Sequence, residues 1–144
     1  MTNSTRTLFG ALFLSTALLS LPALAETTAF KATLSAAEEV PAVTSKGMGS
    51  AEATYDDATK KLTWKGSYSG LGGPVTAAHF HGPAEVGKTG GVQVPVEATG
   101  SPFMGFATLT DAQASDLLGG RLYLNLHTAA NPNGEIRGQV VKVK

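Results

Sequence analysis

The sequence predicts an all-β protein, an antiparallel β-sandwich or Greek-key arrangement of about eight short strands with one short helix. Three observations carry this expectation. Short segments of alternating apolar and polar residues recur along the chain. Turn clusters rich in Gly, Pro and Asn separate them, as at residues 70–74 and 131–134, and supply the backbone angles that reverse a chain. A single segment has the boundary signals of a helix.

Each expected strand shows the period-two alternation typical of a strand with one buried face. In the first, Phe30 and Leu34 share a face with Ala32, and polar residues lie between them. Trp64 and Tyr68 share one face of the third, where core or cross-strand packing is favoured over a sugar-binding platform. In chain order, the expected strands are residues 30–34, 49–55, 61–68, 75–81, 91–96, 105–109, 121–126 and 135–140.

The helix is expected between the sixth and seventh strands, at residues 110–120. Thr110 is a hydroxyl N-cap, and Gln113 stands three residues later, as in a capping box. Gly119 and Gly120 mark the end, because glycine readily adopts the backbone angles that terminate a helix.

An export leader is expected before this domain. Residues 1–25 carry Arg6, then an apolar run at residues 8–21, then Ala23-Leu24-Ala25, which is the pattern of a cleaved secretory signal. The apolar run is too short and interrupted for a membrane span, which needs roughly 20 residues. The mature chain is therefore expected to be a single domain, residues 26–144, that is periplasmic or secreted. It has no cysteine, so its core alone must stabilise it.

The charge balance excludes several classes of partner. The chain has 11 Lys and Arg against 11 Asp and Glu, and removal of the leader takes away Arg6 alone among them. Without a basic tract, nucleic acid is not an expected partner. No membrane contact is expected after leader cleavage, and the sequence does not identify a protein partner.

Three histidines form the candidate site: His79 and His81, two residues apart, and His127. Alternation places His79 and His81 on one strand face and Phe80 on the core face. It likewise places His127 with Tyr123 and Asn125, opposite a buried row of leucines at positions 122, 124 and 126. All three imidazoles are therefore expected off the core face, although parity alone does not show that the two strands are neighbours.

This pattern suggests a metal site, because imidazole nitrogens bind copper, zinc, nickel and iron. Three nitrogens with an open position suit copper, with zinc as the alternative. The same pattern also fits a solvated surface pair and a histidine that caps a turn. Other residues considered as ligands are Met48, Met104 and Glu135, although packing suits the two methionines better. Glu135 and Arg137 are expected to join the three histidines and Asn125 in an outer polar patch, where they form an ion pair or bind turn backbone.

Several of these segments resemble the CHRD domain, named after the repeats of chordin. The resemblance rests on residues 78–84, which include His79 and His81, on residues 122–128, and on the Asn-Pro-Asn-Gly-Glu-Ile-Arg-Gly-Gln stretch at 131–139. The start at residues 34–41 and the strand from Gly49 to Tyr55 are also similar to that family. The resemblance spans about residues 30–141 and implies an immunoglobulin-like β-sandwich, without implying one function.

Two functional hypotheses follow. The first is an exported module that binds copper through His79, His81 and His127, for copper buffering, storage or tolerance. The second is an adhesion or protein-interaction module in which the histidines stabilise turns. An enzyme is not expected, because the sequence has no cysteine nucleophile, no Gly-x-Ser-x-Gly elbow and no phosphate loop.

Overall fold

The computed structural model describes residues 26–144. The expected export leader, residues 1–25, lies outside the described residues, so its cleavage stays a prediction. Within the described part, the chain is an all-β domain with one short α-helix, as the sequence predicts.

Nine strands form the domain, and eight of them match the expected segments. They are β1 (Thr27–Ser35), β2 (Met48–Asp56), β3 (Lys61–Ser69), β4 (Val75–Gly82), β5 (Gly91–Pro95), β6 (Phe103–Thr108), β7 (Tyr123–Thr128), β8 (Ile136–Gln139) and β9 (Val141–Lys142). Two elements were not predicted: the short β9 and a single 3₁₀ turn, η1 (Ala36–Glu38). Both are too short for a periodic pattern to show in the sequence.

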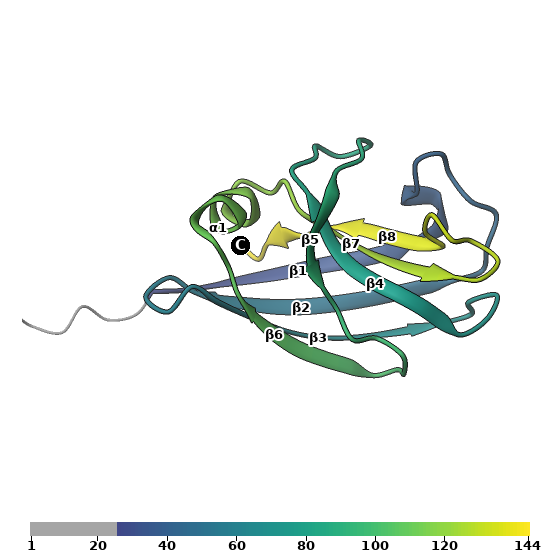
Figure 1. The fold of residues 1–144 in the computed structure, drawn as a ribbon, viewed down its shortest axis with the longest axis horizontal. Helices are drawn as coiled ribbons and strands as arrows, with labels where there is room; N and C mark the ends of the chain where they lie inside the picture. The colour runs from purple at the N-terminus through teal and green to yellow at the C-terminus, as the bar shows by residue number, and fades with distance from the viewer. Residues whose placement is uncertain (1–25) are drawn as a thin grey trace, which may run out of the picture.

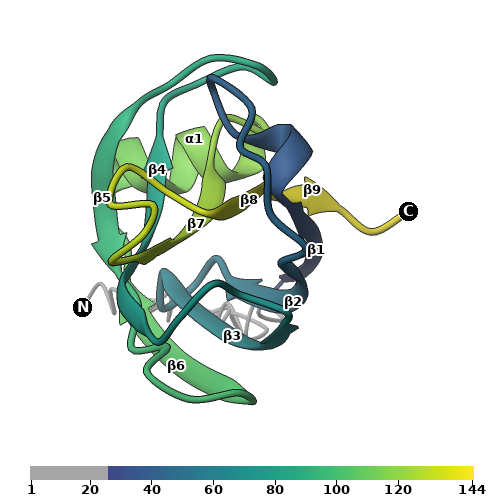
Figure 2. The same cartoon turned by 90° about the vertical axis from the view of Figure 1, so that its right-hand side faces the viewer.

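All the strands belong to one antiparallel sheet that curls on itself. The strand order is β5-β4-β7-β8-β1-β2-β3-β6, with β9 paired to β1. The end-on view shows β5, β4, β7 and β8 facing β1, β2, β3 and β6 across the core (Figures 1 and 2). The two halves join where β8 pairs with β1 at a single register position, Arg137 opposite Ser35. The predicted antiparallel sandwich is therefore confirmed.

The core lies between these two layers. Trp64 on β3 meets Phe80 on β4 edge to face, with ring centroids 5.2 Å apart. The leucine row at 122, 124 and 126 is fully buried, as the alternation of residues 121–126 predicts. Tyr68 packs against Phe103, so the predicted packing role of Trp64 and Tyr68 is also confirmed.

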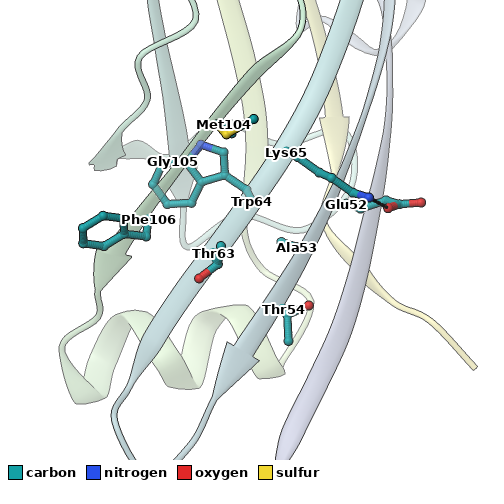
Figure 3. Close-up of a pocket in the computed structure, with 9 residues that line it drawn as sticks. All are labelled: Glu52, Ala53, Thr54, Thr63, Trp64, Lys65, Met104, Gly105 and Phe106. Carbon is teal, nitrogen blue, oxygen red and sulfur yellow. Dashed lines mark ion pairs between the residues drawn. The ribbon is translucent and has the colours of Figure 1, made fainter.

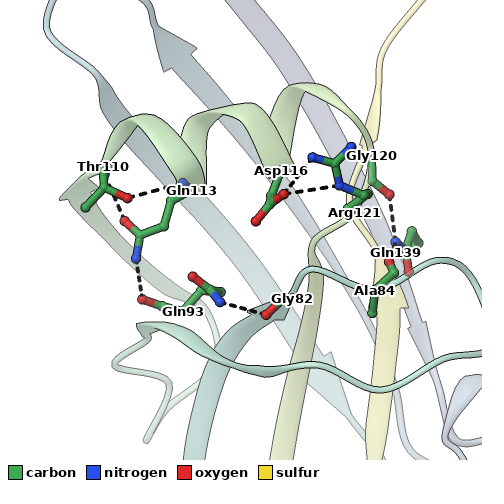
Figure 4. A network of polar contacts seen from close by, with 9 residues as sticks. All are labelled: Gly82, Ala84, Gln93, Thr110, Gln113, Asp116, Gly120, Arg121 and Gln139. Atoms are coloured by element: carbon green, nitrogen blue, oxygen red, sulfur yellow. Dashed lines mark hydrogen bonds and ion pairs between the residues drawn. The ribbon is translucent and has the colours of Figure 1, made fainter.

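The helix α1 (Asp111–Leu118) packs Ala114 and Leu117 into the core. Its capping box is present as predicted: the Thr110 hydroxyl accepts from the Gln113 backbone, and the Gln113 side chain accepts from the Thr110 backbone (Figure 4). The Gln113 side chain also donates to the Gln93 carbonyl in the middle of β5, and so attaches the helix to the edge strand of the sheet. Neither described helix is long and apolar enough to cross a membrane.

Phe80→Ala should destabilise the domain by about 3–5 kcal/mol, because it opens a cavity where the two layers meet. The matched control is Phe106→Ala, since Phe106 is 67% exposed on the outer face of β6. Its cost should stay below about 1 kcal/mol. Urea unfolding of both variants measures the difference, and equal losses would contradict this description of the core.

Candidate metal centre

The three histidines come together because β4 and β7 are paired neighbours. In their register Ala77 lies opposite His127, His79 opposite Asn125 and His81 opposite Tyr123. Since alternate residues share a face, His79 and His81 project on the same side as His127. The ring centroid of His79 lies 5.3 Å from that of His81 and 5.2 Å from that of His127. One ligand nitrogen from each ring lies within 4.8 Å of the other two.

Two backbone carbonyls fix which nitrogens are free. The Nδ1 atom of His81 lies 3.1 Å from the Gly90 carbonyl oxygen, and that of His127 lies 3.0 Å from the Pro132 carbonyl oxygen. A carbonyl oxygen only accepts hydrogen bonds, so each Nδ1 carries the proton. In the neutral rings, Nε2 of both His81 and His127 therefore keeps its lone pair.

His79 completes the triangle. Its Nδ1 atom lies 3.4 Å from Nε2 of His127, which is a bare acceptor in the neutral ring, so His79 is the donor in this contact. Nε2 of His81 is buried and has no hydrogen-bond partner among the residues that the structure describes. The centre thus holds nitrogens that are either unpaired or weakly paired with each other.

The surroundings of the cluster favour uncharged imidazoles. Burial lowers the pKa of His79, and the neighbouring His127 lowers it further. Burial also lowers the pKa of His81, although its contact with the Gly90 carbonyl acts in the opposite direction. Because a metal binds the neutral ring, these shifts keep both residues in the ligating form.

The spacing of the nitrogens is close to that of a bound ion. Two nitrogens held at about 2.0 Å by a tetrahedral ion lie roughly 3.3 Å apart. The observed separations, within 4.8 Å, exceed this value by about 1.5 Å at most. The Gly90 and Pro132 carbonyls already serve as the outer partners that orient metal-bound histidines. The residues present therefore fit an ion with three nitrogen ligands and an open position.

The predicted outer patch is confirmed only in part. Asn125 and Arg137 lie opposite each other on β7 and β8, in one row with His79. Both are buried rather than exposed, because the loops at residues 36–47 and 83–90 cover this face. The alternation of side chains along a strand does not show whether a loop covers the outer face of that strand.

Glu135 does not belong to the patch. Its carboxylate accepts hydrogen bonds from Ser45 (2.6 Å), Thr128 (2.6 Å) and the Gly72 backbone (2.8 Å). Burial raises the pKa of Glu135, but these hydrogen bonds outweigh burial and hold the pKa below its usual value. Glu135 therefore lies outside the histidine cluster, and the described residues show no Glu135–Arg137 ion pair. The alternative that both residues bind turn backbone is confirmed, since Arg137 donates to the Lys88 carbonyl.

Neither methionine joins the cluster. Met48 on β2 and Met104 on β6 are 61% and 73% exposed, on strands that do not pair with β4 or β7. Met104 instead borders a groove of about 500 Å³ on the outer face of β2, β3 and β6, together with Phe106 (Figure 3). The expected packing role is not seen either, because both side chains are largely exposed to solvent.

One neighbour of the site was missed by sequence reasoning. Glu39, which follows η1, is buried over the polar face and accepts a hydrogen bond from Asn125 at 2.7 Å. Burial raises the pKa of Glu39 to about 7, against the lowering effects of Arg137 and Asn125. Glu39 lies far from Asn125 in sequence and in a loop, so no periodicity points to it.

A carboxyl group with a raised pKa binds more protons in the folded state than in the unfolded state. The contribution of Glu39 to stability should therefore be lost as pH rises from about 4.5 through about 7. Glu39→Gln removes this loss, so the variant should gain stability relative to the parent between about pH 5 and about pH 8. Denaturant unfolding at about pH 5 and about pH 8 measures this gain in stability. The control is Glu38→Gln, because Glu38 is the exposed neighbour of Glu39. A Glu39→Gln difference independent of pH would contradict it.

Of three comparisons with known proteins, one found a match. The family model described as CHRD domain matches residues 30–140, which is most of the chain. The match includes all three histidines and both strands that carry them. No curated protein and no solved structure matches the chain significantly. The chain belongs to the CHRD domain family.

Proposed function

We propose that this chain is an exported copper-binding module with His79, His81 and His127 as the ligands. Its role would be to buffer or store copper, or to give tolerance to it, in the periplasm or outside the cell. Zinc is the alternative ion. The leader pattern at residues 1–25 supports export, and the convergence of three imidazoles on one face supports metal binding.

The observation that carries the proposal is the buried Nε2 of His81, which has no hydrogen-bond partner within the described residues. A buried polar atom without a partner costs free energy, and native proteins retain few of them. A metal ion between the three rings would remove this cost, because the lone pair of His81 would then be coordinated.

The donor set favours copper over other ions. Copper(II) binds nitrogen sites more tightly than the other divalent first-row metals do. The chain lacks the thiolates of structural zinc sites, and the cluster contains no carboxylate of the kind that calcium and magnesium prefer. An open coordination position, together with partial exposure of His79 and His127, would let the ion enter and leave.

The interaction-module hypothesis explains less of the site. His81 and His127 do contact the backbone of turns, as that hypothesis requires. Each contact uses Nδ1 alone, however, so the turns do not account for Nε2 of either ring. Turn stabilisation also gives no reason for three imidazole rings to gather within 6 Å of one another, with centroids at most 5.9 Å apart.

Titration of metal-free residues 26–144 with Cu(I), Cu(II) and Zn(II) should reveal one ion per chain, bound most tightly as copper. Each of His79→Ala, His81→Ala and His127→Ala should weaken the affinity at least about tenfold, since even outer-sphere changes cost that much. The affinity should fall below about pH 6, because protonated imidazole cannot bind a metal.

The matched control is Met104→Leu, which removes a possible copper ligand far from the cluster and should leave the affinity unchanged. Unaltered affinity in all three histidine variants would overturn the proposal. If the chain instead bound zinc more tightly than copper, and the three histidine variants lost that affinity, the site would stand and the ion would be zinc.

A further inference from the structure

Residues 83–90, which connect β4 to β5, form a strap across the polar face of β7 and β8. Its beginning is fixed by Gln139 on β8, whose side-chain amide donates to the Ala84 carbonyl and to Gly120 (Figure 4). Further along, the Arg137 guanidinium donates to the Lys88 carbonyl at 2.7 Å. The strap is therefore tied to the sheet at several points before it reaches the metal centre.

The last residue of the strap, Gly90, forms the link to the histidines. The Tyr123 hydroxyl accepts from the Gly90 backbone at 3.2 Å and lies 3.3 Å from the Gly90 carbonyl oxygen. The same carbonyl accepts from Nδ1 of His81. A Cβ at position 90 would lie 2.7 Å from the Cα of Gly82, so the close approach of the strap requires glycine.

Tyr123 also contacts His81 through its ring. The two rings are nearly parallel, with an interplanar angle of 7° and centroids 5.1 Å apart. The Arg137 guanidinium lies 4.0 Å from the centroid of the Tyr123 ring. Because β4 and β8 flank β7, the imidazole and the guanidinium reach Tyr123 from opposite sides. The ring of Tyr123 is thus fixed between them.

We propose that Tyr123 is the positioning residue of the metal centre. Its hydroxyl holds the Gly90 carbonyl where that carbonyl keeps the His81 proton on Nδ1, and this leaves Nε2 of His81 free for the ion. This inference rests on the proposed function for its effect on metal affinity. Its effect on the His81 ring does not, since that effect exists in the metal-free protein.

A purely structural role for Tyr123 predicts that the proton on the His81 ring stays where it is when the hydroxyl is removed. Tyr123 is buried, so loss of its hydroxyl would lower stability whether or not it governs His81. Stability therefore does not distinguish the two roles. The position of the proton on the His81 ring does, because only the link through Gly90 alters it.

The test compares Tyr123→Phe with Tyr68→Phe. Both variants remove a hydroxyl that contacts a loop carbonyl, but the Tyr68 hydroxyl donates to Ala98, outside the strap. Nitrogen-15 NMR of the imidazoles in the metal-free chain reports which nitrogen carries the proton. Titration with Cu(I) then gives the affinity of each variant.

In the parent and in Tyr68→Phe, the His81 proton should reside on Nδ1. In Tyr123→Phe it should spread to Nε2, and the Cu(I) affinity should fall by about 10- to 100-fold, as for other outer partners of metal-bound histidines. An unchanged proton position and affinity in Tyr123→Phe, beside a parent that binds Cu(I), would overturn the role of Tyr123 alone. A parent that binds no metal would overturn the proposed function, while the NMR comparison would still decide whether Tyr123 orients His81.

Discussion

The register between β4 and β7 is the constraint on which the site depends. Phe80 lies directly opposite Leu124 in this pair, and both side chains are buried in the core. A slip of one residue would turn Phe80 outward and place His79 and His81 in the core, which the burial of apolar surface strongly disfavours. Core packing therefore also sets the relative positions of the three imidazoles.

Loops also cover the outer side of this strand pair, and the side chains buried there are polar. The Gly90 and Pro132 carbonyls approach from two different loops, and each fixes one histidine tautomer. Glu39 and Arg137, an acidic and a basic side chain, lie on the same face, and Asn125 lies beside both. The histidines at the edge of this layer remain partly exposed, which combines a rigid arrangement of nitrogens with access from solvent. A site that is held in position before it binds loses less conformational freedom on binding.

The sequence predicted the parts of this structure that repeat. Alternation gave eight strands, the core row of Phe80 and the leucines of β7, and the shared face of His79 and His81. It did not show that β4 and β7 pair, because sheet order depends on long-range contacts that no local pattern encodes. The same limit explains why Glu39 and the strap were missed and why Glu135 was assigned to the wrong side. These residues act from loops or strand ends, where the period-two rule no longer applies.

The claim that three imidazoles of this chain bind one copper ion is tested most directly by X-ray absorption at the copper edge of the loaded protein. The expected spectrum shows about three nitrogen neighbours near 2.0 Å, with the outer-shell scattering of imidazole rings. A first shell made of oxygen atoms, or one that contains sulfur, without imidazole scattering would contradict it.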